Sequence, residues 1–426
     1  MGNSDSYTRR VIDGELDELL PYLPAIALDG AKGVGKTATA GGRAVTTYRL
    51  DDPATRELLA ADPTRLTAAR EPILVDEHQR WEPAWDFVRR SVDDDSRPGR
   101  FLLTGSATMP HPSSHSGAGR IVRLPMRPMT LPERGLTTPT VSLAGLLSGT
   151  ARIEGSTGFA LADYTRAIVR GGFPGMQTLP DRPARAALAG YADLIVDRDV
   201  PEAGFGVRNP AQMRAWLRAI AAATATTATW ETLRDAASPG RSDPPPRSTT
   251  GPWTDALTRT WVYDPLPAWQ PGFSHLTRLA ASPKHHLVDP ALACTLLALT
   301  ADDLLSGGGP TPVVPRDGVF LGSLFESLAT LSVRVFAQAA EAQVGHLRRR
   351  DGDHEIDLMV HGTGRRRVAI EVKLSRLVTD TDVKHLLWLK GLLGDELADM
   401  VVLTTGGDAY RRRDGVAVVP LALLGP

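Results

Sequence analysis

The sequence has little cysteine and little lysine, and it lacks a long apolar run. Cys294 is the only cysteine among 426 residues, which excludes an internal disulfide and is typical of a reducing compartment. No uninterrupted apolar run reaches about eighteen residues, so we expect no transmembrane helix and no membrane partner. The polar start MGNSDSYTRR lacks the apolar core of a signal peptide. These absences predict a cytoplasmic protein.

The charge balance excludes a uniformly basic, nucleic-acid-binding surface. The formal net charge is −1, so any contact with DNA or RNA would need a local patch. A single cysteine and scattered histidines give no zinc-ligand spacing, and we predict no zinc site. With 42% hydrophobic residues, the chain is long enough for two or three domains that each bury a core.

Lysine is rare in this chain, and its positions are informative. Two lysines lie in one glycine-rich turn and a third lies in a Glu-Val-Lys triplet. An ammonium group is a compact point charge, whereas the guanidinium of arginine is bulky and planar. Lysine at these places therefore suggests that the ammonium group has a chemical role there. Chance placement is the alternative. The six lysines are Lys32, Lys36, Lys284, Lys373, Lys384 and Lys390.

The glycine-rich turn follows the apolar run Ala25–Gly30 and reads GAKGVGKT at Gly30–Thr37. It satisfies the P-loop pattern G-x-x-x-x-G-K-[ST], between a predicted strand and a predicted helix. Lys36 would neutralise the β- and γ-phosphates of ATP, and the Thr37 hydroxyl would ligate Mg²⁺. A turn without a ligand is the alternative. The glycines whose N–H groups would close on the phosphates are Gly30, Gly33 and Gly35.

Two further apolar runs end in polar residues that suit the same site. ILVDE at Ile73–Glu77 predicts a buried strand whose end presents Asp76 to the metal, while Glu77 would polarise the attacking water. FLLTGSA would place Thr104 or Ser106 beside the γ-phosphate. An acidic turn and an ordinary strand end are the alternatives for these two runs.

Two arginines follow in GRIVR, and either could stabilise the charge that develops on the transferred phosphoryl group. We predict that Arg120 contacts the nucleotide, within the chain or from a neighbouring subunit, and Arg123 is the second candidate. A solvated arginine is the alternative for both. The predicted cofactors are ATP and Mg²⁺. The predicted catalytic residues are Lys36, Asp76 and Glu77.

A second constellation lies in the last third of the chain. Glu371 and Lys373 form an E-x-K pair on one predicted strand, and the period of two puts both side chains on one face. Asp357 and Glu371 would hold a second Mg²⁺, and Glu326 would complete its shell. Lys373 would orient the attacking water. The pattern resembles the PD-(D/E)xK nucleases, and exposed strand residues are the alternative.

The order of these motifs resembles the bacterial and archaeal AAA-type ATPases, whose usual pattern is GARQVGKT, IDEVQR and LTGSS. The likeness continues through an LPER segment, GGFP at Gly171–Pro174, YADLIVDRDV at Tyr191–Val200 and LPAW. It ends with Phe325–Glu326, EIDL and AIEVK. The resemblance implies an ATPase core, a helical and winged-helix middle and a restriction-endonuclease-like end. Two departures are His78, in place of an aliphatic residue, and the serine- and proline-rich loop Met109–Arg120.

We therefore predict an α/β protein with a P-loop NTPase parallel sheet at residues 1–140. A helical and winged-helix-like region would follow at 141–280, and a PD-(D/E)xK restriction-endonuclease-like α/β domain at 281–426. The expected function is Mg²⁺-dependent ATP hydrolysis coupled to a nuclease-like module that binds DNA or RNA. One alternative is an ATP-gated nuclease. Another is a nucleotide-dependent switch that self-associates or recruits a protein partner, with an inert nuclease-like domain.

Overall fold

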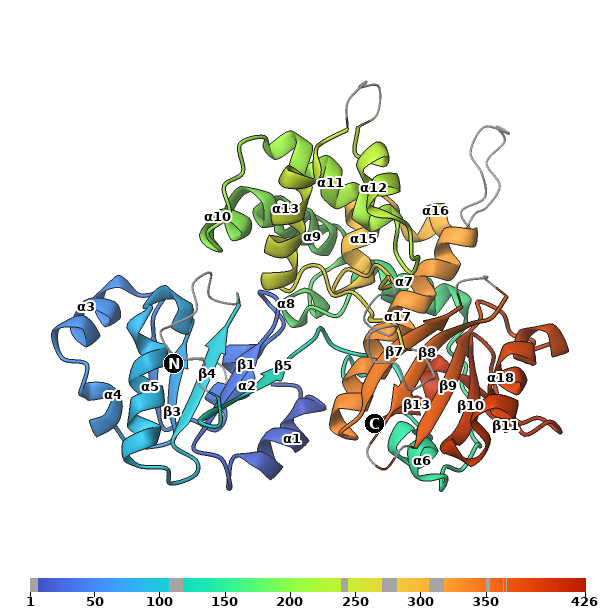
Figure 1. Ribbon diagram of the computed structural model, residues 1–426, viewed down its shortest axis with the longest axis horizontal. Helices are drawn as coiled ribbons and strands as arrows, with labels where there is room; N and C mark the ends of the chain where they lie inside the picture. Colours follow the sequence, from blue (N-terminus) through green and yellow to red (C-terminus); the bar gives the residue numbers. More distant parts are fainter. Residues whose placement is uncertain are drawn as a thin grey trace.

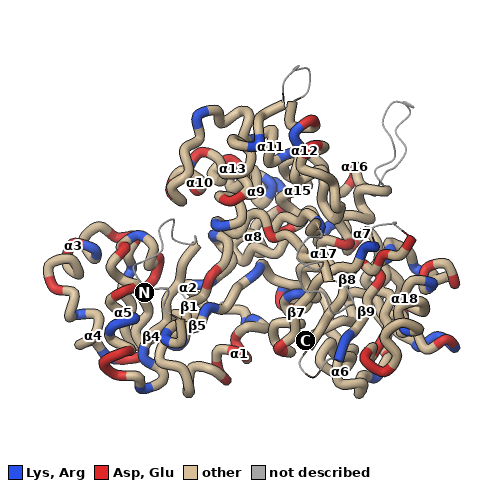
Figure 2. The backbone as a smooth tube through the Cα atoms, viewed as in Figure 1, with Lys and Arg blue, Asp and Glu red and all other residues tan. Residues whose placement is uncertain are grey.

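The computed structural model describes residues 7–106, 118–238, 244–269, 282–305, 318–349, 353–362, 364 and 366–426. A parallel sheet with helices comes first, a helical part follows, and a mixed sheet comes last (Figure 1). The α/β class is confirmed. Most of the predicted loop Met109–Arg120 lies outside the described residues. Lys and Arg positions and Asp and Glu positions are both spread along the backbone of all three parts (Figure 2).

Five described strands form the N-terminal sheet, all parallel, in the order β2-β3-β4-β1-β5. The three central strands are buried along their full length, as expected for apolar runs with helices on both faces. Leu28 packs in one core with α1, and Ala27 packs in the other with α5. The elements are α1 Ile12–Leu19, β1 Ala25–Asp29, α2 Lys36–Gly41, β2 Thr46–Arg49, α3 Pro53–Ala61, α4 Arg65–Ala68, β3 Ile73–Asp76, the 3₁₀-helix η2 His78–Arg80, α5 Pro83–Asp94, β4 Phe101–Gly105 and β5 Ile121–Pro125.

The strand order brings three motifs to one edge of this sheet. Strand β4 lies between β1 and β3, and Leu28 pairs with Thr104 in parallel register. Because the carboxyl ends of parallel strands meet at the same edge, the turn after β1, Asp76 at the end of β3 and Thr104 become neighbours. The candidate site is built at this edge.

Helices make up most of the middle part. The stretch Met213–Ser238 is divided between two helices, because the β-branched threonines between residues 224 and 229 disfavour a helix. In this link Ala225 has a φ of 60°, and its N–H donates to the His285 carbonyl oxygen at 2.8 Å. The helices are α7 Leu161–Arg170, α8 Pro174–Gln177, α9 Asp181–Leu194, the π-helical turn η3 Ile195–Asp199, α10 Val200–Glu202, α11 Pro210–Ala222, α12 Trp230–Ala236, α13 Arg247–Arg259, α15 Pro290–Leu296 and α16 Ala301–Leu305.

Helices α11 to α13 precede two extended segments that pair antiparallel. Tyr263 pairs with Leu287 and Leu266 pairs with Lys284. Three helices followed by a strand pair is the element order of a winged helix, which stays a prediction. The proline-rich segment Ser238–Pro252 is only partly described, and its second half opens α13, with Pro252 inside the helix.

The C-terminal part contains a mixed sheet in the order β11-β12-β10-β9-β8-β7. Helix α17 packs on one face, against Leu358 and Ile370, and α18 packs on the other, against Met359 and Ala369. The elements are α17 Gly318–Ala339, β7 Gln343–Arg348, β8 Glu355–His361, β9 Arg367–Val372, α18 Asp380–Leu393, the 3₁₀-helix η5 Gly394–Glu396, β10 Leu397–Thr404, β11 Tyr410–Arg411, β12 Ala417–Pro420, the 3₁₀-helix η6 Leu421–Leu423 and β13 Leu424–Gly425.

Helix α17 is, over Val319–Ala339, long and apolar enough to cross a membrane by length and composition. However, 61% of its most apolar stretch is buried inside the protein. It packs against β7, β8 and β9 and also against α1, α6 (Leu143–Ser148) and α7. Packing in the core of this protein therefore accounts for its apolar composition.

Contacts cross both predicted boundaries between the parts. Strand β6, Val141–Ser142, pairs with β13 at the far end of the chain, and α6, Leu143–Ser148, packs on β9 and β10. The chain just after residue 140 therefore packs with the C-terminal part. Helix α15 lies beyond residue 280 but packs against α9 and α11 of the middle part. Neither contact has a local sequence signal, because the partners lie far apart along the chain.

Candidate functional site

The glycine-rich turn between β1 and α2 has a backbone that only glycine adopts easily. Gly33 has a φ of 77° and Gly35 a φ of 104°, in the left-handed region that residues with a Cβ rarely occupy. A Cβ on Gly30 would overlap the carbonyl oxygen of Met126. The turn therefore has the cradle-like backbone that the P-loop pattern predicts.

Lys36 is folded over this turn. Its Nζ donates to the carbonyl oxygens of Gly30 at 2.7 Å and Ala31 at 2.8 Å. Burial lowers the pKa of Lys36 to about 8, although the negative charges of Glu77 and Asp29 oppose the shift. No carboxylate of the described residues lies within ion-pair distance of the Lys36 ammonium group. Its positive charge is therefore left for an anion bound in the turn.

Three polar side chains converge beside the turn, on the edge where β1, β3 and β4 end. The Thr37 hydroxyl donates to Asp76 Oδ1 at 2.7 Å, and the Thr104 hydroxyl donates to the same oxygen at 2.5 Å. Asp76 is only 5% exposed. A hydroxyl and a carboxylate at this separation are oxygen donors of the kind that Mg²⁺ accepts. The residues present therefore fit the predicted magnesium ion.

Glu77 stands at the same edge in a conformation that is unusual for a residue with a side chain. Its φ and ψ are 54° and 47°, which costs on the order of 1–3 kcal/mol and persists only where the surroundings impose it. Its N–H donates to Thr104 Oγ1 at 3.3 Å, and its carboxylate accepts from Gln79 at 2.6 Å and Ser106 at 3.3 Å. Thr104 on β4 and Ser106 just after it thus both lie beside the acidic pair.

Arg120 lies elsewhere. It precedes β5, at the end of the sheet where β1 begins, and its Nε donates to Asp93 Oδ1 at 2.7 Å. A strand of this length separates it from the glycine-rich turn by roughly 16 Å. The prediction that Arg120 contacts the nucleotide within its own chain is therefore wrong. Arg123 is also engaged, because its Nε donates to Asp29 Oδ2 at 2.5 Å.

Sequence reasoning missed Arg10, which contacts the turn from its outer side. Its guanidinium donates to the Val34 carbonyl oxygen at 2.8 Å and to Glu133 Oε1 at 2.9 Å, and Arg10 is 5% exposed. Glu133 is the acidic residue of the LPER segment. The signal was present in that segment, but its partner near the N-terminus could not be identified without the fold.

The departure at His78 leaves the phosphate side of the site unchanged. Its imidazole is buried 5.4 Å from the Trp85 ring, and a Cβ on Gly105 would lie 2.7 Å from His78 Nε2. Gly105 therefore makes room for the ring. Burial lowers the pKa of His78 to about 4, so the imidazole is neutral at physiological pH and substitutes for an apolar side chain.

The second constellation is assembled around a lysine that sequence reasoning did not include. Lys284 Nζ lies 2.8 Å from Glu326 Oε1, 3.0 Å from Asp357 Oδ1 and 3.1 Å from Glu355 Oε1. Its side chain is 2% exposed. An ammonium group therefore lies among the carboxylates where the sequence predicted a divalent cation.

The remaining two predicted residues pair with each other. Lys373 Nζ donates to Glu371 Oε2 at 2.8 Å, while Glu371 Oε1 has no hydrogen-bond partner in the described structure. Asp357 Oδ2 accepts the N–H of Val372 at 2.9 Å. No group of three or more His, Cys, Asp or Glu side chains among the described residues could hold a metal ion. In this arrangement the residues do not fit the predicted second Mg²⁺.

Comparison with known proteins gives separate matches for the N-terminal, middle and C-terminal parts. A family model described as an AAA domain matches residues 23–134, and two models of domains of unknown function, DUF8612 and DUF4143, match residues 161–303 and 321–424. The uncharacterized proteins Mb2031c of Mycobacterium bovis and Rv2008c of Mycobacterium tuberculosis are each 27% identical over 420 residues, covering 97% of this chain and 83% of the relative.

Among solved structures, the Walker-type ATPase PABY2304 of Pyrococcus abyssi is similar with a TM-score of 0.38 and 15% sequence identity. The likeness covers 69% of this chain and 97% of that one. The AAA match spans the glycine-rich turn, Asp76, Glu77 and Thr104. The match and the geometry together support a P-loop ATPase module at residues 23–134.

Proposed function

We propose that this protein is a cytoplasmic, Mg²⁺-dependent ATPase that uses its nucleotide state to change the contacts of its middle and C-terminal parts. The observation that carries the proposal is the convergence of Thr37 and Thr104 on one oxygen of Asp76. This convergence lies beside a glycine cradle whose lysine has no carboxylate partner among the described residues. Such an arrangement suits a triphosphate with its metal ion.

The side chains at this edge divide the chemistry between them. Lys36 would exchange its two carbonyl partners for phosphate oxygens, and Thr37 and Asp76 would hold Mg²⁺. The bound ion would neutralise charge on the phosphates. Glu77 would accept a hydrogen bond from the attacking water, with Gln79 and Ser106 holding its carboxylate in place.

The variant Glu77→Gln tests the hydrolytic half of the proposal. It keeps the shape of the side chain but removes the base, so we expect ATP turnover to fall by about 100-fold or more. ATP affinity should stay within a few-fold of the wild type, because the lysine and threonine ligands are untouched. Steady-state phosphate release and calorimetric titration measure the two quantities. The exposed Glu82→Gln is the matched control, and equal turnover in both variants would refute the assignment.

The buried state of Lys36 predicts a pH dependence of binding. Its pKa is lowered to about 8 in the free protein, and a bound triphosphate would raise it again. Above pH 8 the lysine must therefore take up a proton when ATP binds, so the affinity should decrease as the pH rises from 8 to about 9.5. Titration in two buffers of different ionisation enthalpy measures this proton uptake. An affinity independent of pH in that range would contradict it.

For the C-terminal part we propose a role without DNA cleavage, because Lys284 supplies the positive charge that a metal would bring. This favours a nucleotide-dependent switch over an ATP-gated nuclease. The winged-helix order of α11 to α13 is compatible with either a nucleic acid or a protein as the partner. ATP turnover measured with and without DNA or RNA distinguishes these two classes of partner.

A further inference from the structure

The middle part covers the glycine-rich turn. A Cβ on Gly33 would lie 3.8 Å from the Phe173 ring, and a Cβ on Gly35 would lie 3.5 Å from Pro174. Both neighbours belong to the GGFP segment. That segment is fixed in turn, because Asp289 Oδ2 accepts the N–H of Gly172 at 2.6 Å. The phosphate loop is therefore a contact surface between two parts of the chain.

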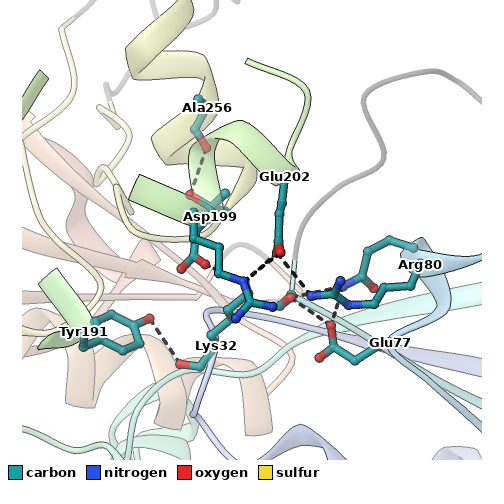
Figure 3. A network of polar contacts seen from close by, with 11 residues as sticks. Lys32, Glu77, Arg80, Tyr191, Asp199, Glu202 and Ala256 are labelled. Carbon is teal, nitrogen blue, oxygen red and sulfur yellow. Dashed lines mark hydrogen bonds and ion pairs between the residues drawn. The ribbon is translucent and has the colours of Figure 1, made fainter. Parts of the chain in front are cut away.

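Polar contacts attach the tip of the turn to the YADLIVDRDV segment and the residues just after it (Figure 3). The Tyr191 hydroxyl donates to the Lys32 carbonyl oxygen at 3.1 Å. The Lys32 ammonium group donates to Asp199 Oδ1 at 2.5 Å and to Glu202 Oε2 at 3.1 Å. Arg80, three residues after Glu77, donates to the same oxygen of Glu202 at 3.2 Å.

The two carboxylates differ in burial and in the direction of their pKa shifts. Asp199 is buried, and burial raises its pKa even though Lys32 opposes the shift. Glu202 is more exposed. Burial opposes its ionisation, but ion pairs with Arg198 and Lys32 lower the pKa of Glu202 to about 2. Lys32 thus favours the anionic form of both groups.

A cavity of about 270 Å³ lies beside these ion pairs. It is bounded by Gln79 and Ser106, the residues that hold the Glu77 carboxylate, and by the cations of the network. The cavity thus connects the hydrolytic end of the site to Asp199 and Glu202. Its charged and polar lining residues are Lys32, Arg56, Gln79, Arg80, Ser106, Asp199, Glu202 and Thr260.

We propose that Asp199 and Glu202 form a nucleotide-responsive latch, holding Lys32 and Arg80 until the phosphates of ATP compete for the same two cations. This inference rests on the proposed function, since it needs a nucleotide in the glycine-rich turn. A ligand shifts a conformational equilibrium only by binding one state better than the other. Here the difference arises because each cation can pair either with the latch carboxylates or with phosphate. ATP binding and release of the middle part from the turn are then coupled.

A latch and a purely supporting role predict opposite changes in the affinity for Mg·ATP when these carboxylates are removed. If the latch competes with ATP, Asp199→Asn and Glu202→Gln should bind Mg·ATP more tightly, by about five-fold or more for a typical coupling. If these contacts only support the site, the same changes should weaken binding or leave it alone. Asp197→Asn is the matched control, because Asp197 lies in the same turn but pairs with Arg214, away from the phosphate loop.

The affinities are measured by calorimetric titration of the full chain with Mg·ATP. Tighter binding by both latch variants, with Asp197→Asn equal to the wild type, is the expected result. Wild-type binding without any gain in the latch variants would overturn the latch but leave the proposed function standing. No binding by the wild type would overturn both. Glu202 is partly exposed, so Glu202→Gln decides the test if Asp199→Asn fails to fold.

Hydrogen exchange on the wild type gives a second readout that needs no variant. Amides of residues 195–202 should exchange faster with a non-hydrolysable ATP analogue and Mg²⁺ than without, because the latch then loses its cations. Slower exchange would mean that nucleotide tightens this contact, and it would overturn the latch.

Discussion

Replacing Lys36 with alanine is expected to lower ATP turnover by about 100- to 1,000-fold, the usual effect of removing one group that stabilises charge in a transition state. The ammonium group is buried and hydrogen-bonded only to carbonyl oxygens among the described residues. Arg10 cannot replace it, because its guanidinium is bound to Glu133 and to the Val34 carbonyl oxygen on the outer side of the turn. The measurement is steady-state phosphate release by both proteins over the same range of Mg·ATP concentrations.

Lys36→Ala should lower ATP binding and hydrolysis without unfolding the protein. Each hydrogen bond of Lys36 to the turn contributes only about 1 kcal/mol net, so Lys36→Ala should keep its fold and its thermal midpoint within a few degrees. Lys384→Ala removes an exposed lysine of α18 and serves as the control. Turnover in Lys36→Ala equal to that of this control would remove the P-loop from the mechanism.

Replacing Lys284 with methionine is expected to destabilise the folded protein by about 3–5 kcal/mol, because it leaves buried carboxylates without their counter-charge. Burial would lower the pKa of Lys284, but Asp357 and Glu326 raise it instead, so the ammonium form is strongly held. Methionine keeps most of the volume and adds no charge. Thermal unfolding at pH 8 measures the effect, with the exposed Lys384→Met as control.

Two conditions should reduce this loss of folding stability in Lys284→Met. Burial raises the pKa of Glu326 to about 8 even with Lys284 present. The folded state of Lys284→Met therefore binds more protons than the unfolded chain, and its stability should increase as the pH falls from 8 toward 5. Mg²⁺ or Mn²⁺ should also stabilise the variant by binding to Glu326 and Asp357 in place of the lost ammonium group, while leaving the wild type unchanged.

These outcomes separate the proposals for the C-terminal part. If Lys284→Met is as stable as the control Lys384→Met, the carboxylates do not need Lys284. Rescue by a divalent cation without DNA cleavage would fit an inert module. Cleavage by the cation-loaded variant, lost again in Asp357→Ala and Lys373→Ala, would instead identify a nuclease that Lys284 blocks.

The sequence predicts the nucleotide edge of the fold well, for physical reasons. Strands β1, β3 and β4 are short, continuous apolar runs because they are buried on both faces, and each ends in the polar residues of the site. Glycines with positive φ appear at Gly33 and Gly35, within the turn that the P-loop pattern identifies. The motif and its backbone are local, so the sequence carries them directly.

The errors and omissions concern contacts between distant parts of the chain. Arg120 follows β4 in sequence, but the parallel topology carries the chain back to the opposite edge before β5 begins. Lys284 and Asp357 are separated by 73 positions, and no periodicity relates them. The rarity of lysine was the one available signal for Lys284, because an arginine-rich chain retained an ammonium group there.

The same limit explains why the latch escaped sequence reasoning. Tyr191 and Asp199 lie in a motif that the resemblance identified, but nothing in that motif indicates a contact with Lys32. Only the fold places the π-helical turn η3 against the phosphate loop. The charged residues at this contact are therefore the part of the site that most needed the structure.

The central claim is that the turn at Gly30–Thr37 holds a triphosphate with its metal ion. Calorimetric titration of the wild type with ATP, in Mg²⁺ and again in excess EDTA, tests it most directly. The account predicts saturable binding with one site per chain in Mg²⁺, markedly weaker binding in EDTA, and loss of binding in Lys36→Ala. An absence of nucleotide binding by the folded wild type at millimolar ATP with Mg²⁺ would contradict it.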